Sequence, residues 1–317
     1  MRRIVMVLAM ISGAAPLAAQ EPQCASTNAF VQAACQAAVD GVRAFYPLAG
    51  MVVTGGNPVI GTAGSLGGLG HFALTARVNA IKAALPDPTA TNQSPVPSSF
   101  NGAVPAPMVE GALGLVKGLG GGLLSVDVLG SALILPTGIR DLSVDSSAAH
   151  IGDAALGIGY GARVGVINGG FPIPAVSVSW MHRTLPRLRY GTLGPAPGTG
   201  DQFEFTMDLT SDSYRAVAGW KFLLVDLAAG IGIDRYKSSN TNIRFYDSPT
   251  TTRTVVINPT NTRALVFVDG GLSLSVLKLV GEVGLQAGKD QSYVTQFSGF
   301  DPKAAHVFGG LGVRFGF

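Results

Sequence analysis

The chain ends in Lys303-Ala-Ala-His-Val-Phe-Gly-Gly-Leu-Gly-Val-Arg-Phe-Gly-Phe317. Side chains along this stretch alternate between two faces. One face is apolar and carries Val307, Leu311, Val313, Phe315 and Phe317. The other is small or polar and carries His306, Gly310, Gly312 and Arg314. Alternation with a period of two predicts a β-strand whose faces meet different surroundings.

The same alternation recurs upstream, most clearly in Ala154–Val166, where Leu156, Ile158 and Tyr160 lie opposite glycines. Further segments with this pattern are 202–210, 213–221, 223–235, 263–276 and 278–288. In segment 202–210 the apolar face would carry Phe203, Phe205, Met207 and Leu209, and the polar face Glu204, Thr206 and Asp208. With weaker segments included, we expect about twelve strands, within a range of about ten to fourteen.

The polar faces decide between two classes of all-β protein. A soluble exported β-sandwich turns one face to its core and covers the other with charges. Here the polar faces are rich in glycine and carry single charges of either sign, which suits a narrow wet interior. The apolar faces then meet lipid, which only helices and closed barrels border without unpaired backbone groups. We predict an all-β, antiparallel transmembrane β-barrel formed by residues 70–317, with the soluble sandwich as the alternative.

The terminal stretch resembles the terminal-strand signal of bacterial outer-membrane β-barrels, which ends in Phe after alternating apolar positions. Val313, Phe315 and Phe317 stand at the positions of that signal. The resemblance implies that the barrel-assembly machinery reads these residues and that outer-membrane lipid surrounds the folded chain. Such barrels have short turns on one side and long loops on the other. Short joins such as 118–122 and long polar stretches such as 238–252 fit that arrangement.

The composition excludes other broad classes. Charged residues make up 13% of the 317 residues, against about 25% in a soluble protein, which argues against an ordinary cytosolic enzyme. The net charge is +3, and basic residues do not cluster as they do in proteins that bind nucleic acid. We expect no nucleic-acid partner.

The first residues predict export. Arg2 and Arg3 precede an apolar run and a small-residue end at Ala19, which is the pattern of a secretory signal peptide. We expect residues 1–19 to be removed, with an N-terminal membrane anchor as the alternative. Cys24 and Cys35 are the two cysteines of the chain, and in an exported protein they predict a disulfide. Asn28 is a candidate N-cap of a short helix over 29–39.

Residues 20–69 form the remaining predicted unit. A glycine-rich stretch follows the helix, and it is either a flexible approach to the first strand or a plug folded inside the barrel. Asn57-Pro58-Val59 is similar to the Asn-Pro-Ala motif in the hatch of the outer-membrane long-chain fatty-acid and hydrocarbon transporter family. In this sequence Val replaces Ala, and the chain is shorter than that family's usual fourteen-strand barrel. The resemblance implies that Asn57 and Pro58 belong to a hatch that moves or binds an apolar ligand.

Isolated charges on the polar faces are candidates for the lumen. The set is Arg77, Asp127, Arg163, Arg183, Glu204, Asp208, Arg215, Lys221, Asp226, Asp234, Arg263, Asp269, Glu282 and Arg314. A ring of charged side chains of one sign would predict an ion-selective pore. The mixed signs favour ion pairs that stiffen the wall, with a weakly selective pore as the alternative.

Catalytic and metal-binding patterns are weak. The four histidines are His71, His150, His182 and His306, and none has a Ser nucleophile beside it in a recognisable motif. No His, Cys, Asp or Glu residues show the spacing of metal ligands on one face. We therefore expect no enzyme activity and no cofactor.

Two functions remain for such a barrel. The first is passive transport of a small or apolar solute across the outer membrane, with the N-terminal segment as a gate. The second is a structural or adhesive barrel whose lumen is filled. A transporter would have an apolar pocket near Met51–Leu69 inside the wall, whereas a filled barrel would leave that segment in the periplasm.

Overall fold

The computed structural model describes residues 20–316 except 120–122, 137–141, 145–149, 152–153 and 171. The predicted signal peptide and Phe317 lie outside the described residues. The helices are η1 (Pro22–Cys24) and α1 (Ala29–Thr54). The strands are β1 (Phe72–Pro86), β2 (Ser98–Val116), β3 (Ser125–Pro136), β4 (Leu142–Val144), β5 (His150–Ile151), β6 (Ala154–Ile167), β7 (Ala175–Tyr190), β8 (Phe203–Phe222), β9 (Val225–Lys237), β10 (Thr241–Ser248), β11 (Thr251–Ile257), β12 (Thr260–Leu274), β13 (Leu277–Gln286) and β14 (His306–Gly316).

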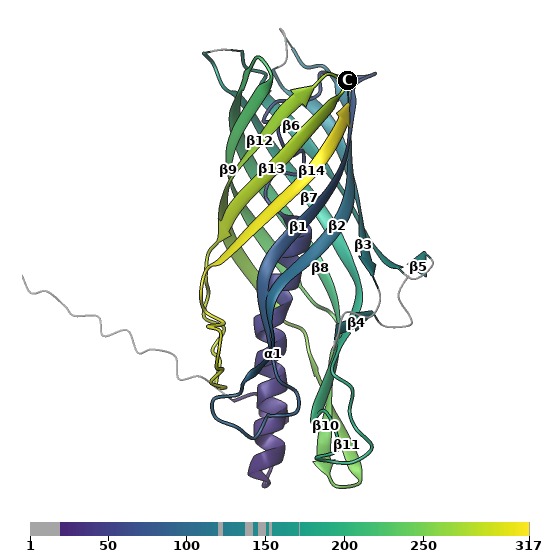
Figure 1. The fold of residues 1–317 in the computed structure, drawn as a ribbon, viewed down its shortest axis with the longest axis vertical. Coiled ribbons are helices and arrows are strands. Elements are labelled where there is room, and N and C mark those ends of the chain that lie inside the picture. Colours follow the sequence, from purple (N-terminus) through teal and green to yellow (C-terminus); the bar gives the residue numbers. More distant parts are fainter. Residues whose placement is uncertain are drawn as a thin grey trace, which may run out of the picture.

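Ten of the described strands close into an antiparallel barrel (Figure 1), in the order β1-β2-β3-β6-β7-β8-β9-β12-β13-β14. Closure comes from β14, which pairs with β1 from Ala73↔Gly316 to Ile81↔Phe308. The remaining described strands extend the wall: β10 and β11 continue from β8, β4 pairs with β7, and β5 pairs with β6. The predicted all-β barrel is confirmed, and its size falls at the lower end of the predicted range.

Two predicted strands are in fact one. Segments 201–211 and 213–222 form the single strand β8, because the chain stays extended through Ser211-Asp212-Ser213. The segment near 252–258 is β11, which lies outside the closed ring. These two differences account for ten wall strands rather than twelve.

The two ends of the barrel differ. At one end the strands are joined by the short connections 117–124, 168–174, 223–224 and 275–276. Leu223 and Ser275 have φ of 51° and 63°, as two-residue hairpin turns require. At the other end lie the long connections 87–97, 191–202 and 287–305 and the β10–β11 hairpin. We call these the short-turn end and the long-loop end. Short turns face the periplasm in outer-membrane barrels.

The middle of the wall is apolar outside and polar inside. Side chains such as Ile231, Ile158 and Leu311 are 63%, 62% and 75% exposed on the outward face, whereas the charged side chains of neighbouring positions point inward and are buried. Lipid covers such a surface without leaving a backbone group unpaired. The outward apolar face was predicted from the alternation.

Toward the long-loop end the wall reverses this polarity. Phe203, Phe205, Met207 and Leu209 of β8 point inward and are at most 1% exposed. These side chains pack against α1, where the centroid of the Phe45 ring lies 6.3 Å from that of Phe205. The prediction that these four side chains face lipid is therefore wrong. Water surrounds the wall beyond the membrane, so the apolar face turns inward there, as in a soluble protein.

Helix α1 stands along the barrel axis, with its lower half among the long loops and its upper end inside the wall (Figure 1). The Asn28 side chain accepts a hydrogen bond from the Phe30 amide at 3.0 Å, so the predicted N-cap is present. The helix continues fifteen residues past the predicted end at residue 39. From residue 44 onward it is apolar on all sides and buried all round, whereas its first half carries Gln32, Gln36, Asp40 and Arg43 along one face. Among the described residues, no helix has the length and apolar character of a membrane-crossing helix.

Candidate functional site

Residues 55–66 connect the end of α1 to the approach to β1 through the inside of the barrel, and we call them the lumenal segment. They form neither helix nor strand. Gly55 has φ of +57°, and a Cβ there would lie 2.8 Å from Glu282 Oε1. The backbone conformation at this helix end therefore favours glycine, and the wall is too close to leave room for a side chain. An irregular segment at membrane depth needs hydrogen-bond partners for its backbone.

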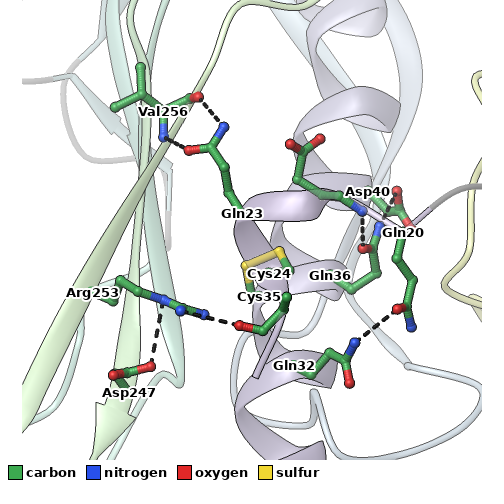
Figure 2. The surroundings of a disulfide bond; sticks show 12 residues. Gln20, Gln23, Cys24, Gln32, Cys35, Gln36, Asp40, Asp247, Arg253 and Val256 are labelled. Atoms are coloured by element: carbon green, nitrogen blue, oxygen red, sulfur yellow. Dashed lines mark hydrogen bonds and ion pairs between the residues drawn. A yellow bond between two sulfur atoms is a disulfide. The ribbon is translucent and has the colours of Figure 1, made fainter. Parts of the chain in front are cut away.

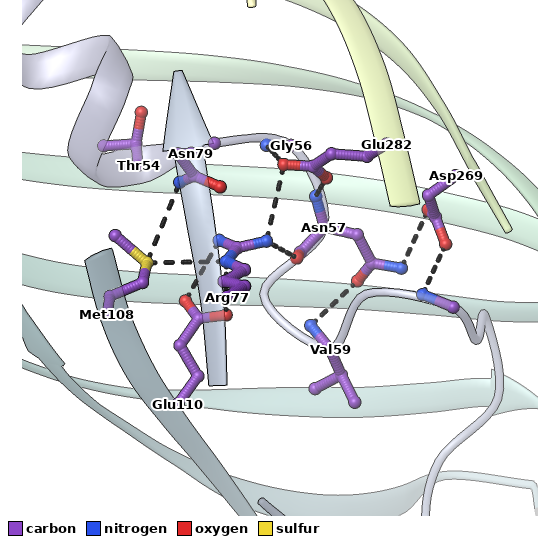
Figure 3. A network of polar contacts seen from close by, with 12 residues as sticks. Thr54, Gly56, Asn57, Val59, Arg77, Asn79, Met108, Glu110, Asp269 and Glu282 are labelled. Carbon is purple, nitrogen blue, oxygen red and sulfur yellow. Dashed lines mark hydrogen bonds and ion pairs between the residues drawn. The ribbon is translucent and has the colours of Figure 1, made fainter. Parts of the chain in front are cut away.

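Carboxylates of the wall accept hydrogen bonds from the backbone amides of the lumenal segment (Figure 3). The pairs are the Gly56 and Asn57 amides with Glu282 at 3.0 Å each, the Gly61 amide with Asp269 at 2.7 Å, and the Leu66 amide with Asp127 at 3.2 Å. Each carboxylate comes from a different strand. The wall therefore supplies acceptors along the whole segment.

Cations of the wall donate to the carbonyl oxygens of the same segment. The pairs are Arg215 with Gly55 at 2.7 Å and Gly56 at 2.8 Å, Arg77 with Asn57 at 3.2 Å, Arg314 with Ile60 at 3.0 Å, and Lys278 with Gly61 at 3.4 Å. Hydrogen bonds to charged groups each contribute about 1.5–3 kcal/mol. The lumenal charges thus serve the backbone of this segment as well as one another.

Asn57 is the best-anchored residue of the lumenal segment. Its Nδ2 donates to Asp269 Oδ2 at 3.0 Å and to the Thr62 carbonyl at 2.9 Å. Its Oδ1 accepts a hydrogen bond from the Val59 amide at 3.0 Å, which forms a turn around Pro58 (Figure 3). The side chain is 1% exposed. The predicted hatch residues therefore lie inside the barrel, where their side chains shape and hold the lumenal segment.

Ion pairs between strands support these contacts. The pairs are Arg77–Glu110 at 3.0 Å, Arg77–Glu282 at 3.4 Å, Arg183–Glu110 at 2.8 Å, Arg163–Asp127 at 2.7 Å and Arg215–Asp234 at 2.7 Å. Buried ion pairs cost desolvation energy, which is offset only when further hydrogen bonds complete them. The lumenal segment supplies several of those hydrogen bonds, so the segment and the charged wall stabilise each other.

The other predicted lumenal residues divide into two groups. Arg263 lies in the lumen toward the long-loop end and donates to the Ala287 carbonyl at 3.0 Å. Glu204 is not in the lumen: it lies on the outward face of β8 and pairs with Arg189 at 2.7 Å and with Arg244. Glu204 was predicted to face the lumen because the polar face of the strand was expected to point inward. Beyond the membrane the polar face of β8 points outward. Glu110 and Lys278 also lie in the lumen and were not predicted there, although both share the alternation of the inward faces of their strands.

The start of the chain is fastened at the long-loop end (Figure 2). Cys24 and Cys35 form a disulfide, with their Cα atoms 5.5 Å apart. The side-chain amide of Gln23 bonds both the carbonyl and the amide of Val256 on β11, at 3.0 and 3.4 Å. Asp40 of α1 accepts hydrogen bonds from the amides of Val294 and Thr295 at 2.9 and 2.8 Å. Helix α1 is thus held by contacts separate from those of the lumenal segment.

Cavities lie at both ends and on the outer wall. A cavity of about 360 Å³ lies beside Phe30 and the β10–β11 hairpin at the long-loop end. One of about 250 Å³ lies at the short-turn end and is lined by Thr62, Ser65 and cationic side chains. Apolar hollows of about 720 and 670 Å³ lie on the outward wall, around Ile231 and Val268 respectively. The cavity that touches the lumenal segment is therefore polar, not apolar as the transport prediction required.

One pair of titratable side chains lies close together on the outward wall without being predicted from the sequence. His182 Nδ1 lies 2.9 Å from Asp212 Oδ1 on neighbouring strands of the outward wall. The two residues are 30 positions apart in sequence, so only the strand register brings them together. In the described part of the chain, no three His, Cys, Asp or Glu side chains gather as a metal site would require.

Comparisons with known proteins concern the fold. The sequence matches no protein-family model and no curated protein. The structure is similar to the outer membrane protease OmpT from Escherichia coli, with a TM-score of 0.41 and 10% identity over 78% of this chain and 97% of that one. It is also similar to the translocator domain of the autotransporter NalP from Neisseria meningitidis, with a TM-score of 0.47 and 11% identity over 88% and 98%. The toluene transporter TodX from Pseudomonas putida gives a TM-score of 0.33 and 11% identity over 78% and 88%.

The closed ring of strands and its apolar outer wall define a bacterial outer-membrane β-barrel. Location in the outer membrane was predicted from the sequence. The toluene transporter is thus among the proteins of similar fold. The exclusion of an enzyme is wrong, because a protease is also among them. A barrel of this kind does not by itself exclude catalysis.

Proposed function

We propose that the protein passes a small solute passively across the outer membrane, and that residues 55–66 are the gate. The observation that carries the proposal is the way this segment is held. Its described hydrogen bonds to the wall run through individual side chains and not through strand pairing; most of these side chains are charged, such as Glu282 and Arg215, and the exception is Ser125, which bonds Ser65. Water can replace such hydrogen bonds one at a time, because a charged side chain that loses its backbone partner can bond to water in its place.

The neighbouring parts of the protein are held differently. Helix α1 is packed through buried apolar side chains, and its start is tied by the disulfide. The wall is held by continuous strand pairing. Local opening draws on regions with little apolar burial; the lumenal segment buries a few apolar side chains, among them Val59 and Ile60, against the many of α1, so we expect the segment to leave before the helix does. The cavity beside the gate is polar and so does not support an apolar solute. The apolar nature of the solute therefore stays a prediction.

The second candidate is a structural or adhesive barrel with a filled lumen. The observation in its favour is that α1 and the lumenal segment themselves fill the inside of the wall, with residues 47–61 buried, although this alternative was expected to leave that segment in the periplasm. The helix, the long loops and the β10–β11 hairpin also project together at the long-loop end (Figure 1). Such a projection offers a surface to the cell exterior even if nothing passes through the barrel.

Conductance in planar bilayers and solute uptake by liposomes separate the two candidates. We would compare the wild type with the double variant Asp269→Asn, Glu282→Gln, which weakens the acceptors of the Gly56, Asn57 and Gly61 amides. Glu204→Gln is the matched control, because it changes a carboxylate of the same wall outside the lumen. The transport proposal expects brief openings in the wild type and much longer ones in the double variant, with the control unchanged.

Folding of each variant is checked by its resistance to SDS and its change in migration on heating. Asn57→Ala serves as a second variant, because it loosens the segment without removing a charge from the wall. If the folded double variant and Asn57→Ala both fail to conduct and to take up solute, transport is overturned and the filled barrel stands.

A further inference from the structure

The cavity at the short-turn end is strongly cationic. It has a volume of about 250 Å³ and is lined by Lys221, Lys278 and Arg314 together with one carboxylate, Asp226. Three cations and one carboxylate leave two positive charges in excess. Asp226, Lys278 and Arg314 share the inward alternation of β9, β13 and β14, and Lys221 lies beside them at the exposed end of β8. Hydroxyl and amide groups of Thr62, Ser65 and Asn168 complete the lining.

Two of these cations also hold the lumenal segment. Arg314 Nη1 donates to the Ile60 carbonyl at 3.0 Å, and Lys278 Nζ donates to the Gly61 carbonyl at 3.4 Å. Lys278 also contacts Asp226 Oδ2. Arginine has five N–H donors, and the described hydrogen bonds of Arg314 use one of them. The half-buried guanidinium therefore keeps donors directed at the cavity.

We propose that this cavity binds a small oxyanion, a phosphate or a carboxylate, and that the bound anion releases the lumenal segment. The inference rests on the proposed function, since it names what opens the gate. Guanidinium and ammonium donors form their strongest hydrogen bonds with such oxygens. The volume is below the range of about 300–1,000 Å³ found for drug-sized ligands, so a small anion fits it.

Release follows from competition for the same donors. In the closed state Arg314 and Lys278 are shared between the cavity and the Ile60 and Gly61 carbonyls. Once the segment has left, both cations lose these carbonyl partners and can turn more donors to the anion, with Lys278 still beside Asp226. The anion therefore binds the open state more tightly, and a ligand shifts an equilibrium by the ratio of its two affinities.

Trp220 provides a direct readout of binding. It lines the cavity, and its Nε1 donates to the Pro172 carbonyl at 3.0 Å. The chain has two tryptophans, so Trp180→Phe leaves Trp220 as the single reporter. Inorganic phosphate is titrated at constant ionic strength into this protein in phosphatidylcholine liposomes. We expect a saturable change in emission, weakened at least tenfold by Lys278→Gln with Arg314→Gln and unaffected by the control Lys303→Gln.

Release is measured separately with Val59→Cys, a buried position of the lumenal segment. The native cysteines are joined in the disulfide, so a membrane-impermeant thiol reagent reports on position 59. Phosphate should speed labelling at least fivefold. Saturable binding without faster labelling overturns the release step, and the absence of a saturable response overturns the anion site.

A lipid headgroup carries the same chemistry as a free phosphate. The titration is therefore repeated in liposomes that contain phosphatidylglycerol. If the anionic lipid alone produces the full emission change, the headgroup is the ligand and the soluble anion is overturned. Binding in phosphatidylcholine liposomes would keep the site, and the transport proposal would be removed if the double variant Asp269→Asn, Glu282→Gln and the variant Asn57→Ala both fail to conduct and to take up solute.

Discussion

The Asn57 side chain donates a hydrogen bond to Asp269 Oδ2 at 3.0 Å, across 212 positions of sequence. This contact joins the lumenal segment to strand β12 of the wall. The other oxygen of Asp269 accepts the Gly61 amide at 2.7 Å. One carboxylate therefore holds both ends of the turn around Pro58, which makes it the point where the lumenal segment is most sensitive to a change of charge.

Asn57→Asp should loosen the lumenal segment more than Asn57→Ala does. The new carboxylate would face Asp269 at hydrogen-bond distance with no donor between them, and Glu282 lies beside both. Like charges in a buried site repel strongly. We expect faster cleavage of residues 55–66 by an added protease in Asn57→Asp than in Asn57→Ala, measured on liposomes with the wild type as reference. Equal cleavage of the two variants would contradict the role of Asp269.

Phe205→Ala should destabilise the protein by about 3–5 kcal/mol, the usual loss for removing a buried aromatic ring. The ring is fully buried against Phe45 and Tyr190. Phe222→Ala is the matched control on the same strand, where the ring is 43% exposed on the outward face, and its loss should stay below about 2 kcal/mol. Unfolding by guanidinium in lipid vesicles measures both. A larger loss for Phe222→Ala would show that the assignment of faces on β8 is reversed.

Replacing both cysteines by serine should free the start of α1 and leave the barrel intact. The disulfide closes a short loop within residues 24–35 and does not reach the wall. A loop of this length is worth about 3 kcal/mol by the loop-entropy relation. We expect faster proteolysis of residues 20–35 with unchanged heat-dependent migration of the barrel. If that migration were lost, the disulfide would be required for the barrel itself.

Acidification should loosen the long-loop end through Glu204. Partial burial acts to raise the pKa of Glu204, but hydrogen bonds from Arg189 and the Leu193 amide, with the charge of Arg244, hold that pKa below its usual value of 4.5. A carboxylate with a lowered folded-state pKa stabilises the fold above its unfolded pKa, and the contribution disappears as pH falls through the folded value.

The pH window of this effect therefore begins near pH 4.5 and extends below it. Hydrogen exchange of the amides in 191–202 should speed up over that window in the wild type. Glu204→Gln should exchange at a rate that changes little over the same window beyond the intrinsic pH dependence. An identical profile for both proteins would assign the effect to another group.

Much of the architecture follows from the sequence. Alternation along segments such as 154–166 and 303–317 predicted strands with an apolar and a polar face, and the sparse charge on the polar face predicted a barrel in lipid. Cys24 and Cys35 were paired correctly, and Asn28 caps the helix as expected. These features are local, since each depends on side chains a few positions apart.

The tertiary structure decided which surroundings each face meets. Alternation on β8 is continuous, yet Phe205 points inward and Tyr214 outward, because one lies beyond the membrane against α1 and the other faces lipid. The sequence likewise placed Asn57 in a hatch, but Glu282, Asp269 and Arg215 became its surroundings only when distant strands closed into a ring. A period-two pattern separates two faces of a strand, whereas position relative to lipid, water and the lumen is set by closure of the whole barrel.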